Sequence, residues 1–126
     1  MQFVQTNKAP SAIGPYSQAV VANGMVYTSG QIALRADGSD DILSKDVVAQ
    51  SKQVLQNLEE VLKEAGSSMG QVVKTTIFLA SMDDFVVVNG IYEDAFGSHK
   101  PARATVAVKT LPKNALVEID AVALVG

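Results

Sequence analysis

The dipeptide Asn23-Gly24 constrains the fold of this chain more than any other feature of its sequence. It separates two short runs that are rich in apolar and β-branched residues, 18–22 and 25–29. A two-residue Asn-Gly connection favours a type I′ turn, because both residues tolerate the positive φ that this turn requires. The sequence therefore predicts a β-hairpin in which Ala22 lies opposite Met25.

The same register extends along the hairpin to its open end. It places Val20 opposite Tyr27, and it brings the segments 14–17 and 28–31 together. These segments read Gly-Pro-Tyr-Ser and Thr-Ser-Gly-Gln. We therefore expect a tyrosine, two serines and two glycines to gather at this end of the hairpin.

Residues 47–65 show the periodicity of an amphipathic helix. Apolar and small residues recur there at steps of three and four, and charged residues fill the opposite face. Residues 32–44 read as a surface loop, after which Ser44 is predicted to be the N-cap, with Asp46 near the positive end of the helix. Gly66 is predicted to end the helix.

A second helix is predicted over residues 85–96, after a strand over 72–80. Ser81 and Asp84 resemble a capping box in which Asp replaces Glu, and Gly97 ends the helix. Three consecutive valines and Gly90 give this helix a poor intrinsic propensity, so we expect it to depend on tertiary packing.

Two strands are predicted near the C-terminus, over 102–108 and 116–124, and both alternating sets of their residues are largely apolar. Two helices and about six strands indicate an α+β sheet with the helices on one face. The second apolar face then needs another cover. We therefore predict a homo-oligomer in which sheets pack on sheets.

Composition limits the classes of protein to which the chain can belong. A chain of 126 residues is expected to form a single domain, 1–126, and it has no apolar run long enough to cross a membrane. The N-terminus lacks the pattern of a signal peptide, which favours a cytoplasmic protein. The absence of cysteine excludes disulfides and thiolate chemistry, and His99 is a lone histidine, expected in a surface loop rather than in a metal site. A net charge of −3 without a basic stretch argues against a nucleic-acid partner.

Arg103 is the sharpest candidate for a functional residue. It follows Pro101 at the start of an apolar strand, where a charged side chain requires a partner. A guanidinium matches a carboxylate bidentately, so one reading is a site for a carboxylate ligand. The alternative is a structural ion pair at the end of the strand.

Glu118 is the second candidate, because it interrupts the apolar strand between Val117 and Ile119. Its functional reading is a carboxylate that orients a water molecule for attack. The alternative is a charge that discourages aggregation at an interface or edge. Asp120 shares its face of the strand and is a weaker candidate.

Four other residues are candidates for ligand binding. Tyr16 lies in a rigid turn and could close a pocket, Ser29 and Gly30 could offer a hydroxyl and a backbone N–H to an anion, and Asn89 could reach a ligand from the second helix. For each, packing or solvation is the alternative reading. Ser29 lacks the surroundings of a nucleophile, since no histidine lies near it in the sequence.

Taken together, six short motifs carry a resemblance that covers nearly the whole chain. They are Ile-Gly-Pro-Tyr-Ser-Gln at 13–18, Thr-Ser-Gly-Gln at 28–31, Val-Lys-Thr-Thr at 73–76, Pro-Ala-Arg-Ala-Thr-Val at 101–106, Leu-Pro-Lys at 111–113 and Val-Glu-Ile at 117–119. In this order they closely resemble the Rid family, also called the YjgF family of reactive-intermediate deaminases. The arginine makes the RidA branch the best match.

The resemblance implies a chorismate-mutase-like fold, a mixed six-stranded sheet with two helices on one face. It implies a homotrimer with a site in each cleft between subunits, and no metal or cofactor. It also implies hydrolysis of enamines and imines such as 2-aminoacrylate to 2-keto acids and ammonia. The chemistry needs only positioning and one carboxylate that orients water.

Carried over by motif, Arg103 would bind the substrate carboxylate and Glu118 would position water. The remaining pocket residues would be Tyr16, Ser29, Gly30, Asn89 and the backbone at Thr105. Two positions depart from the family pattern near the expected cleft. Lys100 stands before Pro101 where relatives often carry an aromatic residue, and Gly90 replaces a better helix former.

Two other functions stay open at this point. One is a non-catalytic binder of small 2-keto or amino acids with a regulatory role, which would need Arg103 but not Glu118. The other is the ribonuclease or translation-inhibitor activity attributed to some relatives, against which the acidic charge balance counts.

Overall fold

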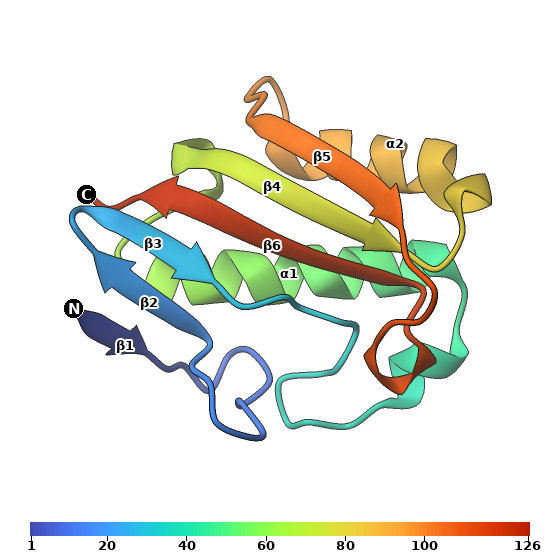
Figure 1. The fold of residues 1–126 in the computed structure, drawn as a ribbon, viewed down its shortest axis with the longest axis horizontal. Helices are drawn as coiled ribbons and strands as arrows, with labels where there is room; N and C mark the ends of the chain where they lie inside the picture. The colour runs from blue at the N-terminus through green and yellow to red at the C-terminus, as the bar shows by residue number, and fades with distance from the viewer.

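Six strands form one mixed sheet in the order β1-β2-β3-β6-β4-β5 (Figure 1) in this computed structural model, which describes all of residues 1–126. β4 and β5 are parallel, and all other neighbours are antiparallel. The strands are β1 (Gln2–Val4), β2 (Ala19–Ala22), β3 (Met25–Thr28), β4 (Val72–Leu79), β5 (Ala102–Ala107) and β6 (Val117–Leu124). The six-stranded α+β fold is as predicted.

Two helices, α1 (Val47–Glu64) and α2 (Phe85–Phe96), lie behind the sheet in Figure 1 and leave its other face uncovered. The core between α1 and the sheet is aliphatic, because the buried stripe of α1 meets alternate residues of β4 and β6. Its largest fully buried side chains include Leu58, Leu62, Ile77, Leu79 and Ile119. Neither helix is both long and apolar enough to cross a membrane.

The hairpin has the predicted turn and register. Asn23 and Gly24 adopt φ values of 52° and 75°, as a type I′ turn requires. Ala22 pairs with Met25, and Val20 pairs with Tyr27. The register extends beyond the strands, since the Ser29 N–H donates to the Gln18 carbonyl oxygen at 2.9 Å. The hairpin thus delivers residues 14–17 and 28–31 to one end of the sheet, as expected.

The uncovered face of the sheet carries both charged and apolar side chains. On β6, Val117 and Ile119 are buried against the helices, whereas Glu118 and Asp120 are half-buried on the other face. Exposed apolar side chains on the uncovered face or at its edge include Phe3, Tyr27, Val106 and Leu124. This second apolar face is the one that the sequence predicts.

The sequence pattern did not locate β1, and two predicted caps are wrong. Ser44 is not the N-cap of α1, because residues 41–44 form a separate 3-10 turn in which the Ser44 hydroxyl donates to the Asp41 carbonyl. The N-cap is Asp46, whose Oδ1 accepts from the Ala49 N–H at 2.9 Å. The Ser81 hydroxyl caps a 3-10 turn at residues 82–84, so Asp84 does not complete a capping box.

Replacing Asp46 with alanine is expected to lower the free energy of unfolding by about 1 kcal/mol, because an N–H of the first turn loses its acceptor. Ser44→Ala is the matched control and should change stability by less than about 0.5 kcal/mol, since its hydroxyl is exposed. Urea unfolding of both variants measures the difference. Equal losses would contradict the role given to Asp46.

Candidate active site

The first part of the candidate site is a cavity of about 560 Å³ at the open end of the hairpin. We call it the Glu118 cavity, because Glu118 on β6 is the only carboxylate that lines it. Tyr16, Ser29 and Gly30 line the same cavity, as the register of the hairpin predicts. Four of the predicted site residues are therefore brought together on one chain.

The Glu118 side chain lies directly against the backbone of Gly30. A Cβ atom added to Gly30 would overlap Glu118 Oε2, and it would lie 2.8 Å from Cδ and 3.0 Å from Cγ. Burial raises the pKa of the Glu118 carboxyl above its ordinary value, and the nearby Asp120 charge raises it further. Glycine is thus the residue that leaves room for this carboxylate.

Gly30→Ala is expected to lower kcat by about 10-fold to 100-fold in any reaction that uses Glu118, because the carboxylate must move from its position. Thermal stability should change little, since the atoms that move are at the end of a flexible side chain. Gly70→Ala is the matched control, because a Cβ there meets only Ser68 Oγ at 4.0 Å. Unchanged kinetics in Gly30→Ala would show that the position of Glu118 does not matter.

Tyr16 and Ser29 are held by hydrogen bonds to the chain itself. The Ile13 N–H donates to the Tyr16 hydroxyl oxygen at 3.4 Å, and Tyr16 remains exposed. The Ser29 hydroxyl donates to the Ser17 carbonyl oxygen. Because a hydroxyl has one proton, Ser29 presents lone pairs to the cavity in this arrangement rather than a donor.

The second part of the site surrounds Arg103, in a separate cavity of about 330 Å³ between α2 and the start of β5. We call it the Arg103 cavity. One guanidinium nitrogen of Arg103 donates to Asn89 Oδ1 at 2.6 Å. Its Cζ lies 5.1 Å from the ring centroid of Tyr92 and 5.7 Å from that of Phe85, which are cation–π distances.

The aromatic side of this arrangement is itself fixed. The Tyr92 and Thr75 hydroxyls share a hydrogen bond of 2.7 Å, and Thr75 is fully buried. Burial raises the pKa of the Tyr92 hydroxyl, so the ring beside the Arg103 guanidinium stays neutral. His99, which lies in a loop as expected and is only partly buried, also lines the Arg103 cavity, and its Nε2 lies 2.6 Å from the Val72 carbonyl oxygen.

Arg103 and Glu118 do not meet within one chain. Arg103 lies on the helix face of the sheet, whereas Glu118 lies on the uncovered face. The only ion pairs join Arg35 to Asp41 and Lys63 to Glu59, so the alternative of a structural Arg103–Glu118 pair within the chain is wrong. Thr105 lines neither cavity, and its buried hydroxyl has no hydrogen-bond partner.

Sequence reasoning missed part of each cavity. Phe85 and Tyr92 were not predicted to contact Arg103, although their spacing from Asn89 places all three on one stripe of a helix. Tyr92 is a core residue that also lines the Arg103 cavity, and Phe85 lies beside the guanidinium. Lys113 lines the Glu118 cavity with a backbone φ of 55°, a left-handed conformation that is unusual for a residue other than glycine. No group of three or more His, Asp or Glu side chains is arranged to hold a metal ion.

Comparison with known proteins decides the family. The family model described as Endoribonuclease L-PSP matches residues 6–125. The chain belongs to this family, which is also called YjgF/Rid. It is 50% identical to a RutC family protein of Synechocystis sp. over 125 residues, which cover 98% of the chain and 96% of that protein.

Two further Rid family relatives bear on the site. A human protein named 2-iminobutanoate/2-iminopropanoate deaminase is 48% identical over 125 residues, 99% of this chain and 90% of the human protein. The crystal structure of E. coli TdcF with bound serine matches with a TM-score of 0.92 and 36% identity, and all of both chains are covered. The similarity to both relatives thus extends over nearly the whole of this chain.

Proposed function

We propose that this Rid family protein hydrolyses 2-imino and 2-enamino acids, such as 2-aminoacrylate, to 2-keto acids and ammonia. The observation that carries the proposal is that one chain holds both an arginine backed by aromatic rings and, in a second cavity, a half-buried carboxylate fitted against Gly30. The 48% identity to a protein named as an imine deaminase supports the same reaction. Serine bound to TdcF supports a ligand of amino-acid size with a carboxylate.

The proposed reaction needs an ordered water molecule and a fixed substrate. An enamine first tautomerises to the imine, whose carbon is electrophilic. A water molecule oriented by Glu118 adds to this carbon, and Glu118 accepts one of its protons and passes it to nitrogen, which gives a carbinolamine. The carbon–nitrogen bond then breaks as the hydroxyl proton passes to the departing nitrogen, and the products are a 2-keto acid and ammonia.

Each predicted site residue has a role in this proposal. Arg103 binds the substrate carboxylate through two parallel N–H donors, and Asn89 orients the guanidinium. Gly30 leaves the space that Glu118 occupies. Tyr16 and Ser29 line the Glu118 cavity, and the backbone at Thr105, which lines neither cavity of one chain, would join the site only between chains.

We further propose that the site forms between copies of the chain in a homotrimer. The two cavities lie on different faces of the sheet. A single chain therefore has no place where Arg103 and Glu118 could act on the same ligand. The uncovered face supplies the apolar surface on which a neighbouring sheet would pack, including Phe3 at 72% exposure. In a cyclic trimer the Arg103 cavity of one chain would meet the Glu118 cavity of the next.

The proposal is tested by generating 2-aminoacrylate from serine with a dehydratase and by following pyruvate formation. We expect this protein to accelerate pyruvate release, and no acceleration would contradict the deaminase function. Light scattering should give the mass of three chains. Co-refolding Arg103→Ala with Glu118→Gln should restore roughly a quarter of the sites by random mixing, whereas either variant alone stays inactive. A monomer, or no restoration, would contradict the shared site.

A non-catalytic binder of small amino or 2-keto acids is the second candidate, and serine bound to TdcF is the observation that favours it. Both functions need Arg103, but only the enzyme needs Glu118. A variant Glu118→Gln that binds pyruvate normally and hydrolyses nothing supports the enzyme. Unmodified protein that binds pyruvate without accelerating hydrolysis supports the binder. Incubation with labelled RNA tests the activity that the family's name describes.

A further inference from the structure

The wall of the Glu118 cavity is built largely from loops rather than from strands. The segments 5–17, 30–46 and 108–116 contribute most of its lining and have few backbone partners in the sheet. Buried backbone carbonyl and N–H groups must nevertheless be paired. Three buried carboxamide side chains supply the partners, namely Gln18, Gln50 and Asn57, which are 2%, 0% and 1% exposed.

Gln18 holds the loop that precedes β2. Its Nε2 donates to the carbonyl oxygens of Thr6 at 3.1 Å, Ala9 at 3.3 Å and Pro10 at 2.8 Å. Its Oε1 accepts from the Thr6 N–H at 2.7 Å. Gln18 therefore ties the start of this loop, which includes the cavity residue Pro10, to the beginning of the hairpin. The end of the loop, which includes the cavity residue Tyr16, leads directly into Gln18.

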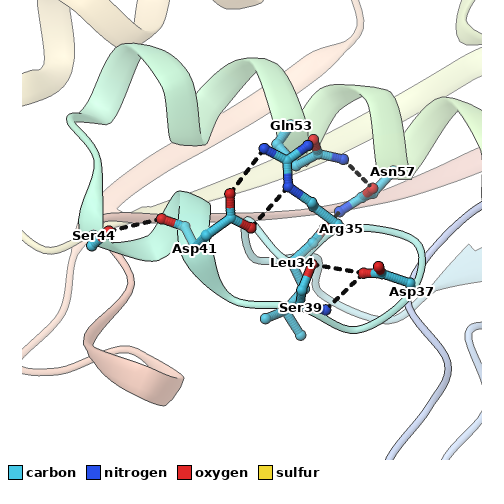
Figure 2. A network of polar contacts seen from close by, with 8 residues as sticks. All are labelled: Leu34, Arg35, Asp37, Ser39, Asp41, Ser44, Gln53 and Asn57. Carbon is cyan, nitrogen blue, oxygen red and sulfur yellow. Dashed lines mark hydrogen bonds and ion pairs between the residues drawn. The ribbon is translucent and has the colours of Figure 1, made fainter.

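Asn57 holds the loop that follows Gly30. From the inner face of α1, its Nδ2 donates to the carbonyl oxygens of Leu34 at 2.9 Å and Ile32 at 3.3 Å, and both residues line the cavity. Its Oδ1 accepts from Gln53 Nε2 at 2.9 Å, which fixes the orientation of the amide (Figure 2). The wall beside Gly30 is therefore tied to the helix.

The same loop carries the ion pair of Arg35 with Asp41, which has two hydrogen bonds of 2.8 and 3.0 Å (Figure 2). Both side chains are about half exposed, so solvent weakens this pair. The buried Asn57 is thus the stronger restraint on the loop.

Gln50 connects two further segments through the core. Its Nε2 donates to the carbonyl oxygens of Leu43 at 3.2 Å and Lys45 at 3.1 Å, and its Oε1 accepts from the Leu116 N–H at 2.9 Å. Leu116 lies between the cavity residues Lys113 and Glu118 in the sequence. Gln50 therefore fixes the backbone at Leu116, between the two cavity residues Lys113 and Glu118.

We propose that Gln18, Gln50 and Asn57 are positioning residues for the Glu118 cavity, a role that rests on the proposed function of that cavity. An apolar side chain of similar size would fill the same volume, but it would leave loop carbonyl and N–H groups unpaired. Each carboxamide uses both its donor and its acceptor, and most of their backbone partners lie in the loops of the cavity wall. Together they set the wall around Glu118, Gln50 and Asn57 from outside the cavity and Gln18 from its lining.

The test uses the neutral variants Gln18→Met, Gln50→Met and Asn57→Leu in the full chain, with Gln56→Leu on the exposed face of α1 as the matched control. We expect each variant to speed backbone hydrogen exchange by about 10-fold or more in its own loop, while α2 and β5 exchange as in the unmodified protein. The KM for the imino acid should rise by about 10-fold or more. Faster exchange throughout the chain with an unchanged KM would overturn the proposal.

The exchange measurement separates this proposal from the proposed function. If the unmodified protein shows no deaminase activity, faster exchange confined to the loops still supports the positioning role, and uniform exchange still overturns it. The unmodified protein gives a second measurement if a variant does not fold. The Thr6 and Leu116 N–H groups donate only to carboxamide oxygens, so they should exchange as slowly as core amides. Exchange of both at the rate of free loop amides would overturn the proposal.

Discussion

Replacing Glu118 with glutamine should lower kcat for imino-acid hydrolysis by about 10²-fold to 10⁴-fold, the range that a positioned proton acceptor contributes. The amide has nearly the same shape, but it cannot accept a proton from the attacking water. KM should change little, because in the proposed site Arg103 binds the substrate. Steady-state kinetics with imine generated in situ measure both constants. A kcat within about 3-fold of the unmodified value would exclude Glu118 as the residue that orients water.

The same substitution should increase stability at neutral pH. Because burial raises the pKa of Glu118, the folded protein binds more protons than the unfolded chain between the ordinary and the raised values. The free energy of unfolding therefore falls as pH rises through that window, and glutamine removes this fall. Urea unfolding across the acid range measures the effect. The raised pKa also predicts that, as the pH is lowered, activity is lost at a higher pH than it would be if the pKa of Glu118 were that of an exposed glutamate.

Replacing Arg103 with alanine should lower kcat/KM by about 10²-fold and weaken pyruvate binding by a similar factor, since two charge-assisted hydrogen bonds are lost. Arg103→Lys should recover only part of the affinity, because an ammonium does not form the bidentate pair. Stability should fall by less than about 1 kcal/mol, since the side chain is exposed.

Calorimetric titration with pyruvate measures the Arg103 effect directly. Arg35→Ala is the matched control, because Arg35 is the only other arginine and its guanidinium pairs with Asp41 on the surface. That variant should bind pyruvate within about 2-fold of the unmodified protein. Normal pyruvate binding by Arg103→Ala would show that the substrate carboxylate lies elsewhere.

Local sequence features predicted the parts of the fold that local chemistry determines. Asn23-Gly24 sets the backbone of the turn, so the pairing of Val20 with Tyr27 follows from the turn alone. The first residue of α1, Val47, was predicted correctly, but its N-cap was wrong. Ser44 and Asp46 are both good N-caps, and only the 3-10 turn at residues 41–44 decides between them.

The division of the candidate site could not be predicted in the same way. Alternation places Glu118 and Val117 on opposite faces of β6. It does not say whether Arg103, on another strand, lies on the same face of the sheet as Glu118. That depends on the parallel pairing of Thr75 with Arg103, a contact between residues far apart in the chain. The aromatic partners of Arg103 depend on how α2 packs on this strand.

Heat should affect ligand recognition before it affects the fold. The residues that hold the Arg103 guanidinium all lie on α2, whose run of valines and Gly90 gives it little tendency to stay helical without its neighbours. Segments of this kind open at lower free energy than the surrounding core. The protein would then lose the orientation of its arginine while the sheet and α1 remain intact, so inactivation would be a local and reversible melting of one helix.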